Sequence, residues 1–78
     1  MDYDRNKLDD TVLALLHLTT RDYGTGPRAW KGHDWDALNR LHQKGFIGNP
    51  KSMAKSVTLT EEGKVRAEQL FCKLFGKT

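Results

Sequence analysis

Hydrophobic residues recur at helical spacing near both ends of the 78-residue chain. In residues 5–19 one face carries Leu8, Val12, Leu15, Leu16 and Thr19, and Asp4 is placed to cap the first turn. After Thr60, a second capping residue, apolar side chains follow the i, i+3, i+4, i+7, i+8 pattern at Ala67, Leu70, Phe71, Leu74 and Phe75. The pattern therefore predicts a helix at each end of the chain.

The apolar stripe of the first helix is wide, because Leu13 and Leu18 extend it on both sides. Its polar remainder is narrow and consists chiefly of Asp10, His17 and the small Ala14. A helix that is apolar around most of its circumference is either central to the fold or covered in part by a second chain. We therefore expect a homodimer that uses this helix, alone or with the C-terminal helix, as its interface.

The middle of the chain alternates turn residues with a short helix. Residues 21–33 are predicted to form a loop because Gly and Pro punctuate them, with one helical turn over residues 28–31. A helix then begins at the capping residue Asp34 and ends at Lys44. Gly45 follows it in the left-handed position that commonly terminates helices.

A β-hairpin is predicted between the second and third helices. Residues 46–48 form its first strand, residues 49–52 supply turn chemistry, and residues 56–59 form the return strand. The least exposed side chains should be Leu38, Leu41, Leu59, Leu70 and Phe71, with Leu15 and Leu74 beside them. The chain is thus expected to form one α+β domain over residues 1–78, with three helices and a hairpin wing.

The sequence WDALNRLHQKGFI at residues 35–47, followed by KSVTLTEEG at residues 55–63, resembles the second half of bacterial winged-helix regulators. The multiple-antibiotic-resistance and phenolic-acid regulators are examples of that family. The resemblance implies that residues 34–44 correspond to the recognition helix and residues 49–55 to the tip of the wing. Only residues 20–33 are left for the helix that normally precedes the recognition helix, so the expected fold is a truncated winged helix.

Over nearly its whole length the chain is also similar to a family of short bacterial proteins with no assigned function. The resemblance rests on the acidic start, the leucine-rich first helix, the segment RAWKGHDW at residues 28–35 and the lysine-containing hairpin. It implies no biochemical role.

Charge is unevenly distributed along the chain, whose net charge is +3. Residues 1–36 hold seven Asp against five Lys or Arg, whereas residues 37–78 hold eight Lys or Arg against three Glu. No acidic residue lies between Asn39 and Thr60. Such a basic stretch can contact phosphates, and it can equally be an ordinary solvated surface.

The outer face of the second helix and the hairpin supply six candidate DNA contacts: Asn39, Arg40, Gln43, Lys44, Lys51 and Lys55. Amide and guanidinium side chains are the types that read base edges, and lysines commonly contact phosphates. Asp34 and Asp36 oppose this interpretation, because they lie at the helix end that usually enters the groove. Asp36 is also spaced to pair with Arg40.

Two tryptophans form a second candidate surface. Trp30 and Trp35 either cover the thin core or lie at the surface beside Arg28 and Lys31. At the surface they would suit a protein partner, or stack on an unpaired base. The alternative to DNA binding is thus a protein-interaction module whose partner surface comprises Trp30, Trp35, Leu13 and Leu18.

Other classes of function find less support in the sequence. The three His and one Cys lie at no spacing typical of zinc sites, and no nucleophile has an identifiable partner. We expect no catalytic residue, no cofactor and no metal. The longest apolar run, residues 12–16, is too short to span a membrane, and the acidic start lacks the order of a secretory signal. A single cysteine fits a reducing cytoplasm. The expected function is therefore non-catalytic binding.

Overall fold

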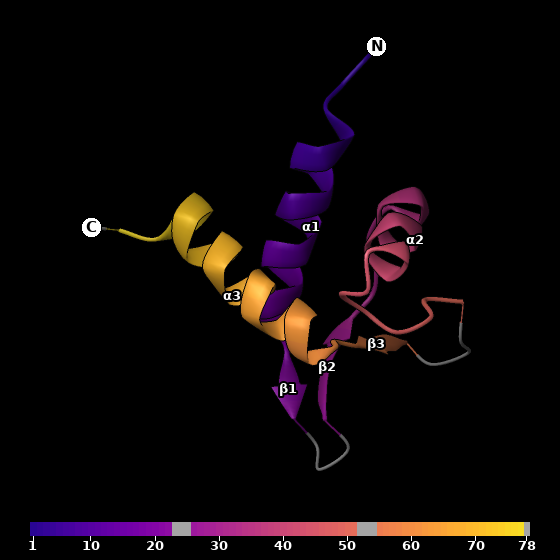
Figure 1. Ribbon diagram of the computed structural model, residues 1–78, viewed down its shortest axis with the longest axis vertical. Helices are drawn as coiled ribbons and strands as arrows, with labels where there is room; N and C mark the ends of the chain where they lie inside the picture. The colour runs from indigo at the N-terminus through magenta and orange to yellow at the C-terminus, as the bar shows by residue number, and fades with distance from the viewer. Residues whose placement is uncertain (23–25, 52–54, 78) are drawn as a thin grey trace.

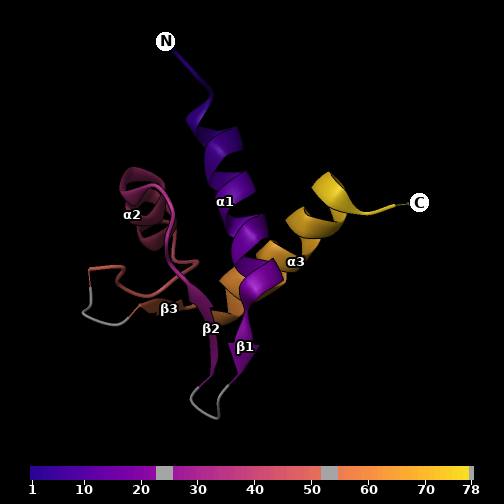
Figure 2. The same cartoon turned by 180° about the vertical axis from the view of Figure 1, so that it is seen from behind.

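The computed structural model describes residues 1–22, 26–51 and 55–77. Its elements are α1 (Arg5–Thr19), β1 (Arg21–Asp22), β2 (Pro27–Trp30), α2 (Trp35–Gln43), β3 (Ser56–Thr58) and α3 (Glu61–Phe75). Helix α1 runs through the middle of the molecule, with α2 on one side, α3 on the other and the strands near its C-terminal end (Figure 1). The view from behind in Figure 2 shows the same arrangement.

Each helix begins at the capping residue that the sequence predicts. The side chains of Asp4, Asp34 and Thr60 accept hydrogen bonds from the backbone N–H groups three residues later. These bonds satisfy amide groups that have no partner within the helix. The three predicted N-terminal boundaries are therefore confirmed.

Helix α2 ends in the predicted glycine motif. Gly45 has a φ of 81°, which disfavours residues with a side chain. Its N–H donates to His42 O, and the N–H of Phe46 donates to Leu41 O. This pair of bonds is a Schellman motif, and it turns the chain sharply back toward α3.

The segment between α1 and α2 contains two strands, so the predicted loop is wrong for residues 21–22 and 27–30, and the helical turn over residues 28–31 is wrong too. Residues 31–33 belong to no helix or strand, as predicted, and residues 23–25 lie outside the described residues. β1 and β2 pair antiparallel, with Arg21 opposite Arg28, and β2 also pairs with β3, with Ala29 opposite Val57. Ala29 is buried while Trp30 is exposed, which is the alternation of a half-buried strand. Pairing with β3, which is distant in sequence, outweighs the local turn signals.

The predicted hairpin is present in a shortened form. Ile47 makes an isolated bridge to Leu59, and the N–H of Gly48 donates to Thr58 O at 2.8 Å. Residues 52–54 of the expected wing tip lie outside the described part of the chain. Only residues 31–34 separate β2 from α2, so no helix precedes α2 there. The fold is a small α+β domain with three helices and an antiparallel sheet, compatible with a truncated winged helix.

The core confirms most of the predicted buried residues. Leu38, Leu41, Leu59 and Leu70 are all buried. Phe71 and Leu15 are only half-buried, and Leu74 is 46% exposed, so Leu15 is not among the least exposed side chains either. Leu74 continues the inward stripe of α3, but the C-terminal half of this helix diverges from α1 (Figure 1). The expected burial of Phe71 and Leu74 is therefore wrong.

Helix α1 is the centre of the fold, and this position accounts for its wide apolar stripe. It contacts α2, α3 and β2. Leu13, expected at a partner surface, is completely buried together with Ala14 and Leu16. Leu18 is the exception, with 56% of its surface exposed. The assignment of Leu13 to a partner surface is corrected, because neighbours within the chain already cover it.

Candidate functional site

A buried ion cluster joins α1 to α2. The carboxylate of Asp9 is completely inaccessible to solvent. It accepts three hydrogen bonds from Arg40, at 2.8–3.0 Å, and one from Lys44 Nζ at 3.2 Å. Burial raises the pKa of Asp9, but the hydrogen bonds and charges of the two cations outweigh it, so the pKa lies below its ordinary value. Asp9 is therefore a buried carboxylate held in its charged form.

This ion cluster changes how the basic residues Arg40 and Lys44 are interpreted. Arg40 bonds Asp9 in place of the expected partner Asp36. Lys44 lies on the same flank of the helix and serves the same carboxylate. Two of the six candidate DNA contacts thus compensate a buried charge. They are less available to phosphates and base edges than their positions in the sequence suggest.

Three of the other candidates meet at one polar groove. Asn39 and Gln43 line it from α2, and Lys51 lines it from the segment that follows Ile47. The groove also includes His42 and Asn49, which sequence reasoning did not select, and has a volume of about 310 Å³. None of these five residues carries a carboxylate. The sixth candidate, Lys55, is exposed but does not line the groove.

Hydrogen bonds within the groove fix how two of its side chains are presented. His42 Nδ1 lies 3.1 Å from Ile47 O, so a neutral ring donates there and keeps Nε2 as an acceptor. Asn49 Oδ1 accepts from the N–H of Lys51 at 2.9 Å, which leaves its amide NH₂ as a donor. The groove thus offers donors, acceptors and one ammonium group.

Both tryptophans lie at the surface, so they do not cover the core. Trp30 is 60% exposed and Trp35 is 54% exposed. The indole of Trp30 lies against Gly32, where a Cβ atom would overlap the ring. Lys31 Nζ lies 5.8 Å from the ring centroid of Trp35, within the range of a cation–π contact. Of the two interpretations of these residues, surface exposure is the one that the fold supports.

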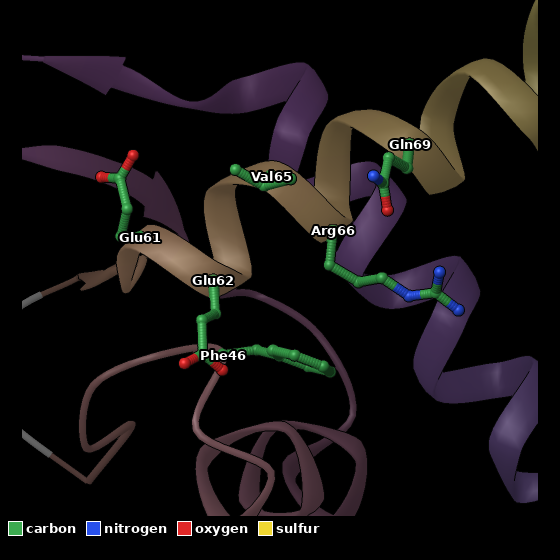
Figure 3. A pocket seen from close by; sticks show the side chains of 6 residues that line it. All are labelled: Phe46, Glu61, Glu62, Val65, Arg66 and Gln69. Carbon is green, nitrogen blue, oxygen red and sulfur yellow. The ribbon is translucent and has the colours of Figure 1, made fainter.

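Helix α3 carries further exposed apolar surface. A hollow of about 390 Å³ lies along the first turns of this helix. Figure 3 shows the side chains that line it, which are Phe46, Val65, Glu61, Glu62, Arg66 and Gln69. A second hollow of about 410 Å³ lies between α1 and the later turns of α3, and its apolar lining comes from Leu70 and Leu74. Both hollows are lined mainly by hydrophobic atoms, as surfaces for protein contacts often are.

The described residues contain neither a metal-binding cluster nor a membrane-spanning helix. No group of three or more His, Cys, Asp or Glu side chains in residues 1–22, 26–51 and 55–77 is arranged to hold a metal ion. Within the same ranges, no helix is long and apolar enough to cross a bilayer.

Comparison with known proteins assigns the chain to a family. Residues 4–77 match a family model described as a domain of unknown function, DUF6429. The chain is 48% identical over 75 residues to "Uncharacterized protein y4hR" of Sinorhizobium fredii (strain NBRC 101917 / NGR234), an alignment that covers 96% of this chain and 97% of that protein. No solved structure matches the chain. These matches confirm the expected bacterial family without an assigned function, and the chain belongs to the DUF6429 family.

Proposed function

We propose that the chain is a non-catalytic, cytoplasmic binding module that contacts duplex DNA through the groove between α2 and residues 49–51. The observation that carries this proposal is the composition of the groove. Its lining joins amide side chains to a histidine and a lysine, without a carboxylate. Asn and Gln hydrogen-bond adenine edges, and lysine contacts phosphates.

The placement of the groove also favours this function. Asn39 and Gln43 are one turn apart on the exposed side of α2, so both can approach one ligand. Lys51 lines the same groove from the segment that follows Ile47, where it can meet a backbone phosphate. This arrangement is compatible with the recognition helix and wing that the sequence resemblance implies.

Acidic residues at the start of α2 oppose the binding of DNA, so removing one of their charges should increase the affinity. The carboxylate of Asp34 accepts a hydrogen bond from the N–H of Ala37, so its charge stabilises the helix terminus. Asp36 is exposed and has no capping role. Replacing Asp36 with Asn should therefore strengthen binding to any duplex, because it removes repulsion from phosphates.

Fluorescence anisotropy with a labelled mixed-sequence duplex tests the proposal. Lys51→Ala should weaken binding to all sequences alike and reduce the slope of log K against log salt by about 1. Gln43→Ala should cost about 1–3 kcal/mol on preferred sequences only. Lys73→Ala, which removes an exposed lysine on α3, is the matched control and should leave binding unchanged. Absence of binding to duplex DNA at low salt would contradict the proposal.

Self-association through α3 is a second candidate function, favoured by a separate observation. Leu74 belongs to the inward stripe of α3 yet is exposed, and Phe75 beside it is 48% exposed. The apolar stripe of α3 thus continues beyond its contact with α1, into the hollow that Leu70 and Leu74 line. A second copy of the chain would cover this surface on both molecules at once.

Sedimentation equilibrium distinguishes this candidate. The parent should show a concentration-dependent dimer, and Leu74→Asp should convert it to a monomer without unfolding it. Glu68→Asp, a change on an exposed position of the same helix, should leave the dimer intact. A parent that remains monomeric at high protein concentration would rule this candidate out.

A further inference from the structure

The outward face of the sheet gathers basic and aromatic side chains. Ala29 and Val57 are buried against the core, so their strand neighbours point the other way. Cross-strand register places Arg21 opposite Arg28, and Trp30 opposite Ser56. The residues of β1–β3 on this face are Arg21, Arg28, Trp30, Ser56 and Thr58, and none of them is acidic.

Arg28 is held in place on this face before any ligand arrives. Its Nε donates to Ser56 Oγ at 2.9 Å, and its Nη2 donates to Ser56 O at 3.1 Å. Two cations facing each other across strands repel, which is normally unfavourable in a sheet. Arg21 and Arg28 nevertheless occupy opposite positions, so both positive charges belong to the same face of the sheet. The Nη1 of Arg21 also donates to Thr20 O at 2.9 Å.

Trp30 is presented as a platform beside these cations. One side of its indole is supported by Gly32, and the ring of His33 meets it edge-on with centroids 6.1 Å apart. These contacts fix the ring, yet most of its surface stays accessible to solvent. An immobilised, exposed indole loses little entropy when a flat ligand stacks on it.

We propose that this face binds an unpaired nucleic-acid strand, with a base stacked on Trp30 and the adjacent phosphates contacted by Arg28 and Arg21. The pairing of a flat aromatic surface with fixed positive charges matches the alternation of bases and phosphates along a single strand. Both faces of a paired base are covered by its neighbours in the stack. An intact duplex therefore offers no free base face that can stack on Trp30. The inference rests on the proposed nucleic-acid function. It specifies single-stranded nucleic acid as a ligand and the outward face of the sheet as a second binding surface.

The test compares a labelled single strand of about 12 nucleotides, a length within the range of small single-strand sites, with the blunt duplex of the same sequence. Trp30→Ala should weaken single-strand binding by roughly 5- to 150-fold, the range expected for loss of one stacked base. Trp30→Phe should retain part of the affinity. Tyr3→Ala, which removes an exposed aromatic side chain that precedes α1, should have no effect.

Tryptophan fluorescence provides a second measurement. The emission of Trp30 should respond to a single strand only if the strand contacts this residue, and not if Trp30 merely supports the fold. In Trp35→Phe, Trp30 is the remaining tryptophan, and saturating single strand should quench its emission. In Trp30→Phe, the emission of Trp35 should change little. Melting curves of each variant show that the fold persists.

Three outcomes separate this inference from the proposed function. Single-strand binding that depends on Trp30 supports it. Duplex binding that depends on Lys51, with no effect of Trp30→Ala on either probe, overturns this inference and leaves the proposed function standing. No binding of either probe at low salt overturns both.

Discussion

Replacing Asp9 with Asn should destabilise the fold more than any other isosteric change to a charged residue. The substitution keeps the shape of the side chain but removes its charge. It also directs an amide NH₂ donor at Arg40 and Lys44, which are themselves donors. The four hydrogen bonds to the carboxylate cannot all be replaced, because no water-accessible surface remains at Asp9.

The magnitude follows from two opposing effects. A hydrogen bond to a charged group contributes about 1.5–3 kcal/mol, and several reach Asp9. The cost of removing a carboxylate from water offsets part of that sum, and Asn does not bear this cost. The expected loss for Asp9→Asn is about 2–4 kcal/mol, out of roughly 4–12 kcal/mol for a domain of this length. The Tm should fall by roughly 10–25 °C.

The pH dependence identifies the charge as the cause. The pKa of Asp9 in the fold lies below its ordinary value of 3.8, because the cations outweigh burial. Its contribution to stability is therefore complete above that ordinary value and is lost as the pH falls through the lower value of the folded state. The gap in stability between parent and Asp9→Asn should narrow as the pH drops below 3.8.

Urea denaturation followed by circular dichroism, at neutral pH and at pH values below the ordinary carboxyl value, measures this gap. Asp10→Asn is the matched control, because Asp10 is the neighbouring, partly exposed acid and forms no ion pair within the described residues. An Asp9→Asn variant as stable as Asp10→Asn at neutral pH would refute the reasoning. So would a gap that does not change with pH.

Three other substitutions or titrations test separate parts of the account. Leu70→Ala should cost about 2–5 kcal/mol in chemical denaturation, whereas Leu74→Ala should cost far less in the monomer; equal losses would contradict the divergence of α3 from α1. Gly63→Ala should lower the Tm, because a Cβ atom there would overlap the carbonyl oxygen of Phe46; an unchanged Tm would mean that α3 is not in contact with that carbonyl. Burial lowers the pKa of His33, so its NMR titration midpoint should lie below 6.5. Protonation of His33 should then reduce the stability of the fold as the pH falls through that region. A midpoint at or above 6.5 would contradict its partial burial.

Local signals in the sequence were sufficient for the helices. The caps at Asp4, Asp34 and Thr60 and the terminating Gly45 act through bonds to residues nearby in the chain, so their effect can be read without the fold. The strands could not be read in this way. β2 exists because Ala29 meets Val57, a residue distant in sequence, and the turn residues around it indicate a loop.

In the candidate site, too, the sequence identified the side-chain types but not the contacts between distant residues. The amides and lysine of the groove were selected by side-chain type, and the fold brings Asn39, Gln43 and Lys51 together. The engagement of Arg40 was missed, because its partner lies 31 residues away on another helix. A signal was present in the sequence: Asp9 lies between Leu8 and Val12 in an otherwise apolar stripe, and a carboxylate there requires a cation.

The central claim is that this chain binds nucleic acid, and the salt dependence of binding to a labelled single strand tests it most directly. About two phosphate contacts, from Arg21 and Arg28, give a slope of log K against log salt of about −1.4 for a single strand. Raising the salt tenfold from about 20 mM should therefore weaken binding of the parent about 25-fold. Absence of binding to both the single strand and the duplex at low salt, or single-strand binding that does not change over this range, would contradict the account.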